Sequence, residues 1–136
     1  MAVINENIRV ENNGTISFGN YEAAAKQKVN DYKVGEDVYT LRTYKEATRL
    51  EKNARLLIET VPGATVHNMK VSSGVVTFDV EGNDDTQITL ELEGETEYTI
   101  YVDDVNLGKI KTNISGKINF STELGANPKS VKIEKH

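Results

Sequence analysis

Few side chains in this sequence could do acid–base or nucleophilic chemistry. His67 is the only histidine before the final residue, and there is no cysteine, which excludes disulfides, thiolate nucleophiles and cysteine-bound zinc. The predicted strand register places His67 opposite Val80 on an apolar face, so a packed histidine is a simpler interpretation than a general base. No serine–histidine–aspartate set and no glycine-rich phosphate loop can be assembled. We therefore expect a non-enzymatic protein with no catalytic residue, no cofactor and no metal site.

Pairs of carboxylates are the pattern with the clearest possible use in catalysis. Glycoside hydrolysis needs two carboxyl groups about 5 to 10 Å apart, and Glu91 and Glu93 share one strand face. The Asp84-Asp85 and Asp103-Asp104 pairs fall at expected turns, where aspartate is favoured for conformational reasons. Asn106 adds a third oxygen donor near the second pair, but the twelve-residue calcium loop with its closing glutamate is absent. We favour turns and a solvated strand face, and a glycosidase is the enzymatic alternative.

Tyrosines offer a different kind of site, because carbohydrate sites usually stack the apolar face of a sugar on an exposed aromatic ring. The chain has six tyrosines and no tryptophan. Tyr39 and Tyr101 are expected on strand faces opposite their apolar neighbours. They are the candidate carbohydrate-stacking residues of an accessory module.

The distribution of charge argues against two classes of partner. The chain has 16 Lys and Arg residues and 21 Asp and Glu residues, a net charge of −5, and the basic residues are spread along it. Nucleic acids and anionic membranes are bound by clustered basic residues, so we expect neither as a partner. The first residues lack the features of a signal peptide, and no apolar run approaches the roughly 18 residues of a membrane span. The default prediction is a cytoplasmic protein, with export or surface assembly left open.

Alternating apolar and polar residues predict an all-β fold. Short runs of this kind, separated by turns of Gly, Asn, Asp and Ser, indicate about ten or eleven strands, the pattern of an antiparallel β-sandwich or barrel. Residues 21–29 hold the only helix-friendly stretch and are expected as a helical turn or an irregular strand. Val61-Pro62-Gly63 is the strongest break. It separates an N-terminal set of β-hairpins, residues 1–61, from a β-sandwich of residues 64–136, and we expect one cooperative unit.

Four hairpins can be given a register by matching their apolar faces. The first pairs are Ile8 with Phe18, Val10 with Ile16, and Leu50 with Leu56; the later ones are Val71 with Val76, Met69 with Phe78, His67 with Val80, and Ile110 with Ile118. The last pair assumes that residues 107–112 and 116–124 form one hairpin.

The run from Leu92 to Val102 resembles the corner and following strand of fibronectin type III and related immunoglobulin-like modules. A Leu, a Pro or Gly, a Thr and a Tyr recur there at the spacing that this run shows. The resemblance implies an immunoglobulin-like C-terminal half in which the Tyr98 hydroxyl bonds back to the backbone at the corner. The whole chain is also similar to a group of short bacterial proteins sometimes labelled endosialidase, but its arginines form no motif that assigns sialidase roles.

The N-terminal strand supports the functional hypothesis. Ile4, Ile8 and Val10 share one face of an amphipathic strand at a chain end. Such a strand either pairs within its own sheet, the simpler case, or completes the sheet edge of a neighbour, because its backbone groups match any exposed edge. We predict a protein of structural assembly or protein–protein contacts, with another protein or another copy of the chain as partner. Ile4, Ile8 and Val10 form the candidate assembly strand, and the alternative function is the carbohydrate-binding accessory module.

Overall fold

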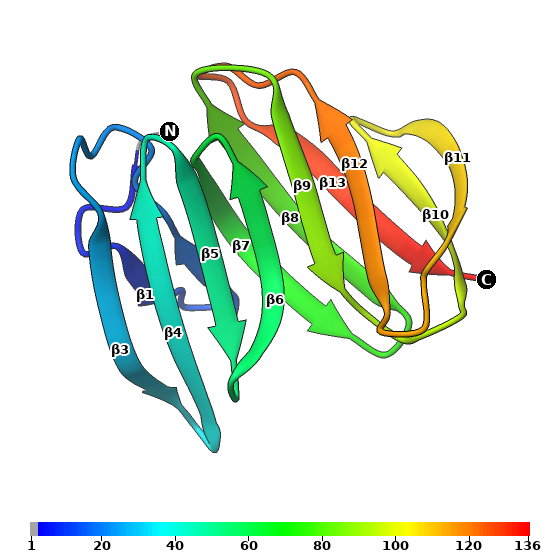
Figure 1. The fold of residues 1–136 in the computed structure, drawn as a ribbon, viewed down its shortest axis with the longest axis horizontal. Helices are drawn as coiled ribbons and strands as arrows, with labels where there is room; N and C mark the ends of the chain where they lie inside the picture. Colours follow the sequence, from blue (N-terminus) through cyan, green and yellow to red (C-terminus); the bar gives the residue numbers. More distant parts are fainter. Residues whose placement is uncertain (1–2) are drawn as a thin grey trace.

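Strands make up 63% of the protein, and no helix occurs among the residues described. The structure is a computed structural model that describes residues 3–136. It confirms the predicted fold class, because two antiparallel sheets pack together as a β-sandwich (Figure 1). The strands are β1 (Ile8–Val10), β2 (Ile16–Phe18), β3 (Gln27–Val34), β4 (Asp37–Tyr44), β5 (Ala47–Lys52), β6 (Arg55–Val61), β7 (Ala64–Ser72), β8 (Val75–Gly82), β9 (Thr86–Glu91), β10 (Glu97–Val102), β11 (Val105–Lys111), β12 (Lys117–Thr122) and β13 (Lys129–Lys135).

The two sheets differ by one strand. The seven-stranded sheet has the order β1-β2-β7-β8-β13-β10-β11, and the six-stranded sheet has the order β12-β9-β6-β5-β4-β3. Each sheet takes strands from both sides of Pro62, so the predicted segments 1–61 and 64–136 both contribute to both layers. The edge strands are β1 and β11 in one sheet and β12 and β3 in the other.

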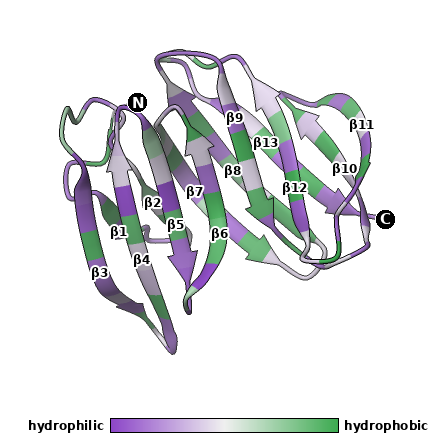
Figure 2. Cartoon of the chain, in the orientation of Figure 1, coloured by the Kyte–Doolittle hydropathy of each residue, from purple (hydrophilic) through white to green (hydrophobic). Residues whose placement is uncertain are grey.

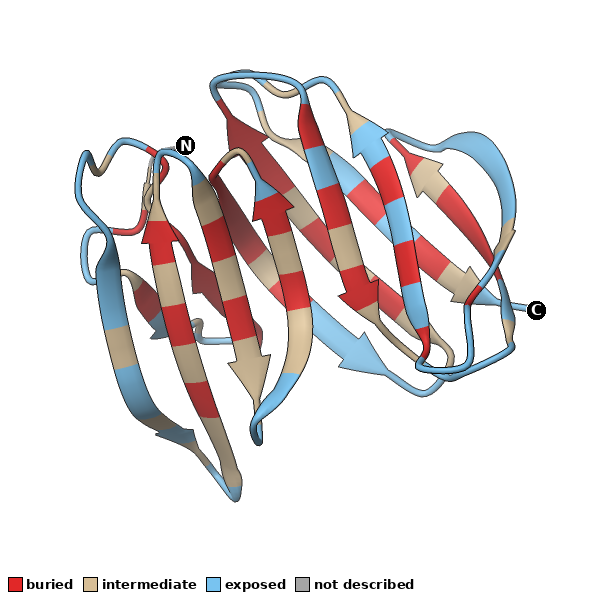
Figure 3. Cartoon of the chain, viewed as in Figure 1, coloured by how far each residue is buried: buried red, intermediate tan, exposed pale blue. Residues whose placement is uncertain are grey.

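The core fills the space between the sheets. Successive side chains of a strand point to opposite faces, and Figure 2 shows hydrophobic and hydrophilic residues alternating along most strands. Figure 3 shows the matching alternation of buried and exposed residues. Each large apolar side chain buried in this way contributes about 1.5–3 kcal/mol relative to an exposed one. The core residues with almost no exposure include Phe18, Leu41, Leu50, Ile58, Val66, Val80, Ile88, Leu90, Ile100, Ile118 and Ile133.

Two predicted hairpins have the expected register near their turns. β1 and β2 pair Ile8 with Phe18 and Val10 with Ile16, and β7 and β8 pair Val71 with Val76. These pairs follow from alternation and turn length alone, because no bulge intervenes between the turn and the paired residues.

β7 departs from the predicted register further from its turn. Asn68 and Met69 together face one residue of β8, which is a β-bulge, and Asn68 has φ 54°. The extra residue moves His67 to a position opposite Asp79, on the outer face of the sheet, so the predicted pairing with Val80 is wrong. Asn tolerates this left-handed conformation better than most residues do.

The β5–β6 hairpin also differs from its predicted register. Leu50 lies opposite Ile58, not Leu56, because the turn contains two residues rather than three and Leu57 is the extra residue of a β-bulge next to it. These residues, Asn53 and Ala54, have φ 52° and 67°, as a type I′ turn requires. A left-handed alanine is uncommon, which is why the sequence predicts a three-residue turn here.

The predicted hairpin between residues 107–112 and 116–124 does not form. Ile110 in β11 lies opposite Tyr98, and Ile118 in β12 lies opposite Leu90, so the two strands belong to different sheets. The intervening loop crosses between the layers, and Gly116 approaches Leu92 so closely that a Cβ there would lie 2.0 Å from the carbonyl oxygen of Leu92. Alternation fits either arrangement, because it shows which face is buried but not which strand is the neighbour.

The helix-friendly stretch forms turns followed by a strand. Residues 21–26 contain turns and bends, and β3 begins at Gln27. A short alanine run without an apolar stripe has too little to stabilise a helix. Residues 3–136 contain no helix long and apolar enough to cross a membrane.

Candidate functional site

The N-terminal segment packs on its own chain. β1 pairs with β2, and the Ile4 N–H donates to the Gly19 carbonyl at 3.1 Å. Ile4 and Ile8 are buried, whereas Val10 is 42% exposed. The three candidate assembly residues therefore do not form one free apolar face, because two of them are already covered within the chain.

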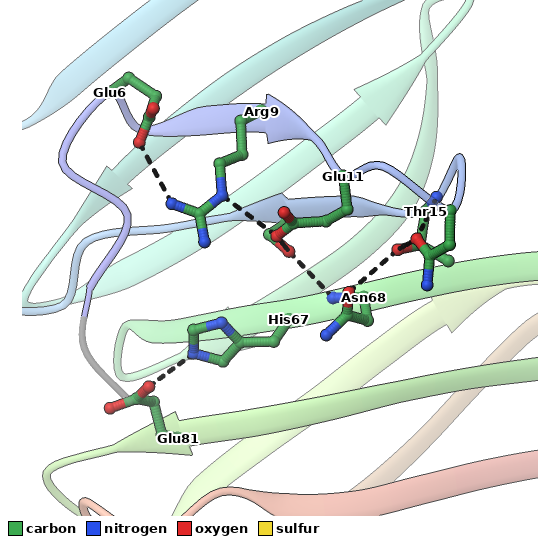
Figure 4. A network of polar contacts seen from close by, with 9 residues as sticks. Glu6, Arg9, Glu11, Thr15, His67, Asn68 and Glu81 are labelled. Carbon is green, nitrogen blue, oxygen red and sulfur yellow. Dashed lines mark hydrogen bonds and ion pairs between the residues drawn. The ribbon is translucent and has the colours of Figure 1, made fainter.

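Polar contacts connect this segment to β7 (Figure 4). Arg9 lies 3.6 Å from Glu6 and 3.1 Å from Glu11, and the Ser17 hydroxyl donates to the Glu11 carboxylate. The Asn68 N–H, released from the ladder by the bulge, donates to Ser17 Oγ at 3.0 Å. The hydrogen bond from Ser17, with a smaller effect of Arg9, lowers the pKa of Glu11. The bulge thus supplies a backbone donor that connects β7 to β2.

A buried cluster of three ionisable side chains lies beside these contacts. His67 Nε2 and Glu81 Oε1 are 2.5 Å apart, and the Tyr21 hydroxyl donates to Glu81 Oε2 at 2.9 Å. Glu81 is completely buried, and both of its carboxylate oxygens have a partner. Burial and, to a smaller extent, the bond to Glu81 raise the pKa of Tyr21 to about 12. We refer to His67, Glu81 and Tyr21 as the buried triad.

The geometry of the buried triad suits a structural role. A tyrosine nucleophile needs activation and access to substrate, whereas Tyr21 has a raised pKa and is only 6% exposed. Buried polar groups are tolerated when their hydrogen bonds are satisfied. The triad fastens the loop that carries Tyr21 to the outer face of β7 and β8.

The carboxylate pairs lie in turns and ion pairs. Asp103-Asp104 forms the turn between β10 and β11, with positive φ at both residues, and Asp84-Asp85 lies in the connection between β8 and β9. Glu91 and Glu93 each contact a basic side chain, at 2.7 and 2.6 Å. Within residues 3–136, no group of three His, Asp or Glu side chains could hold a metal ion.

The two candidate sugar-stacking tyrosines occupy different environments. Tyr39 shares the inner face of β4 with Leu41, so the expectation of an outward-facing ring is wrong for it. A ring with one polar tip packs well at the margin of a core. Alternation places Tyr39 on the face of Leu41, two residues further along β4, and its neighbour Val38 on the other face. Tyr101 is half-buried on the outer face of β10, and the Lys132 amine lies 5.7 Å from its ring centroid.

Tyr98 occupies the predicted corner. Its side chain is buried, and its hydroxyl accepts a hydrogen bond from the Glu93 N–H at 3.2 Å. The predicted bond between this hydroxyl and the corner backbone is confirmed. The likeness to immunoglobulin-like families remains a prediction.

β11, which we call the β11 edge, exposes apolar residues at the end of the seven-stranded sheet. Val105 is 60% exposed and Leu107 is 52% exposed. Leu107 is the extra residue of a bulge, because Asn106 pairs with Tyr101 and Gly108 pairs with Ile100. Figure 1 shows β11 beyond β12, the last strand of the facing sheet.

The comparisons with known proteins add no relative: no family model, no curated protein and no solved structure matches this chain.

Proposed function

We propose that this chain is a non-enzymatic β-sandwich module of structural assembly or protein contacts, and that copies of the chain associate through the β11 edge. The observation that carries the proposal is the exposure of Val105 and Leu107 on a strand that pairs on one side only within residues 3–136. An open edge strand offers unpaired backbone donors and acceptors to another strand. Exposed apolar side chains on the same strand gain burial when the edge is covered.

β3 lacks this combination although it is the longest edge strand. Its apolar residues pack against the core, and its exposed residues are polar. Both edges contain a bulge, at Asp31 in β3 and at Leu107 in β11, and both carry charges, which limit pairing at sheet edges, so the difference between them lies in the exposed apolar side chains of β11. The exposed residues of β3 are Gln27, Lys28, Asn30, Asp31 and Lys33.

The charges on β11 bear on the strength of the contact. Lys109 and Lys111 lie opposite Thr99 and Glu97, on the outer face of the strand. Lysines on an edge strand limit uncontrolled pairing. We therefore expect reversible, concentration-dependent association rather than aggregation.

The other two routes to function have less support. Exchange of the N-terminal strand would have to release Ile4 and Ile8 from buried positions. Sugar stacking would have to use Tyr101 without Tyr39, since Tyr39 faces the interior of the sandwich. The β11 edge needs no such rearrangement.

Light scattering across a concentration series tests the proposal. The protein should form a dimer or larger species as its concentration rises, and the double variant Val105→Lys, Leu107→Lys should remain monomeric because charge now occupies the edge. Val61→Lys is the matched control, since Val61 is 50% exposed on a different strand, and it should associate like the unmodified protein. A protein that is monomeric at millimolar concentration, or a double variant that associates normally, would contradict the proposal.

A further inference from the structure

A cavity of about 350 Å³ lies between the two sheets at one end of the sandwich. Its walls come from both layers, with Ile16 and Met69 on one side and Val34, Leu50 and Leu57 on the other. Ligand pockets occupy roughly 300–1,000 Å³ and are mostly apolar with a few placed polar groups. The size and the aliphatic lining of this cavity therefore suit a small apolar molecule.

Tyr39 supplies a polar group in the cavity wall. Its side chain is 6% exposed, and its hydroxyl makes no hydrogen bond to any other group in residues 3–136. Thr60 Oγ1 is the only fully buried side-chain polar atom without a partner within residues 3–136, so the Tyr39 hydroxyl is not enclosed by protein and is accessible to a molecule in the cavity. Burial and, to a smaller extent, the charge of Asp37 raise the pKa of Tyr39. The hydroxyl therefore stays protonated and can act as a hydrogen-bond donor.

Two opposite charges accompany Tyr39 in the cavity wall. Asp37 and Lys52 both line the cavity, and their carboxylate oxygen and amine nitrogen are 3.7 Å apart. Lys52 lies directly opposite Tyr39 in the ladder between β4 and β5. Lys70, an exposed residue of β7 in the other sheet, also lines the cavity, so its charged residues are two lysines and one aspartate. Lys52 is paired with Asp37, and Asp37 is the charge that acts on the Tyr39 hydroxyl, so an anionic group bonded to Tyr39 would meet the Asp37 carboxylate.

We propose that this cavity binds a neutral apolar molecule that carries a hydroxyl group. The ligand hydroxyl accepts a hydrogen bond from Tyr39 and donates one to Asp37, and its apolar body lies against the aliphatic walls. A second depression of about 250 Å³ shares Leu57 and Val71 with the first, which gives room for an extended alkyl chain. A sugar fits poorly, because most of its hydroxyls would face aliphatic side chains without partners. This site is separate from the β11 edge and does not depend on it.

Octanol and octanoate test the proposal, because they share one alkyl chain and differ in charge. Met69 is an internal reporter, since the chain has two methionines and Met69 lines the cavity. With methyl-labelled methionine, octanol should shift the Met69 signal in a saturable way, and octanoate should bind about tenfold more weakly. Tyr39→Phe should weaken octanol binding about tenfold, and Tyr101→Phe should not change it.

Three results would overturn the proposal. The first is a Met69 signal that does not respond to octanol, and the second is octanoate binding as tight as octanol binding. The third is an unchanged octanol affinity in Tyr39→Phe, with the circular dichroism spectrum of that variant measured to show that it is folded. None of these results depends on the oligomeric state of the protein, so they can be distinguished from a failure of the proposed association through the β11 edge.

Discussion

The seven-stranded sheet ends in two different ways. At the β1 end, the N-terminal segment pairs with β2, and the buried triad joins the Tyr21 loop to β7 and β8 through satisfied hydrogen bonds. At the β11 end, Val105 and Leu107 are open to solvent and one side of the strand has no partner within residues 3–136. β1 and β11 are both edge strands, so the two ends differ in the burial of their apolar side chains: Ile4 and Ile8 are buried at the β1 end, whereas Val105 and Leu107 are exposed at the β11 end.

The largest expected effect comes from removing the cover at the β1 end. Deletion of residues 1–11 removes the buried Ile4 and Ile8 side chains, each of which contributes about 1.5–3 kcal/mol. Because a domain is stable by only about 5–15 kcal/mol, we expect the truncated chain to be unfolded or nearly so, as thermal unfolding followed by circular dichroism would show. A truncated chain that stays folded but loses its oligomers in sedimentation would instead support exchange of the N-terminal strand.

The next largest effect comes from the centre of the buried triad. Glu81→Leu keeps the site filled but leaves the Tyr21 hydroxyl and the His67 ring nitrogen without their partner. Unsatisfied buried polar groups cost about 1–3 kcal/mol each, so the free energy of unfolding should fall by about 2–5 kcal/mol in urea denaturation. Glu134→Leu, on a half-buried outward position of the same sheet, is the control and should change the free energy of unfolding by less than about 1 kcal/mol. Equal effects of the two substitutions would show that the triad does not fasten the β1 end.

A smaller, pH-dependent effect follows from the raised pKa of Tyr21. The pKa of Tyr21 rises from the ordinary 10 to about 12 on folding. As the pH rises, the unfolded chain therefore releases the hydroxyl proton before the folded chain does. The stability due to Tyr21 is fully present below pH 10 and is lost as the pH rises through about 12. Unfolding measured between these values should show a shallower decline in Tyr21→Phe than in the unmodified protein. Identical pH dependence would mean that Tyr21 is not buried against Glu81.

Tyr98→Phe should have a modest effect at the corner before β10. The substitution removes the hydroxyl that accepts the Glu93 N–H, and one such bond contributes about 1 kcal/mol. We expect that loss in urea denaturation and no loss in Tyr101→Phe, whose hydroxyl makes no hydrogen bond within residues 3–136. A Tyr98→Phe variant of unchanged stability would remove the support for a structural corner.

The strands themselves could be predicted because alternation is a local signal, whereas bulges and neighbours are not. The register of β1 and β2 follows from Val10 and Ile16, but the bulge at Asn68 reverses the face on which His67 lies. Ile110 shows the second limit, because its alternation is the same whether it pairs with Tyr98 or with Ile118. Strand content and the faces of unbulged strands could therefore be predicted from sequence, whereas the face of His67 beyond the bulge and the order of the strands in the sheets could not.

The buried triad was missed for a related reason. Glu81 is 14 residues from His67 and 60 residues from Tyr21 in sequence, so nothing local connects them. A glutamate on the outward side of a strand is normally solvated, whereas Glu81 is buried and bonded to both Tyr21 and His67. The exposure of Leu107 could not be predicted either. It depends on a bulge in β11 and on the position of β12, where the facing sheet ends.

Amide NMR spectra across a concentration series compare the β11 edge with the β3 edge in one measurement. If copies of the chain associate through β11, the amide signals of Val105–Lys111 should shift and become protected from exchange as the concentration rises, while those of Gln27–Val34 should stay unchanged. The β3 edge serves as the internal control because its exposed side chains are polar. Unchanged β11 signals at millimolar concentration, or equal changes at both edges, would contradict the account.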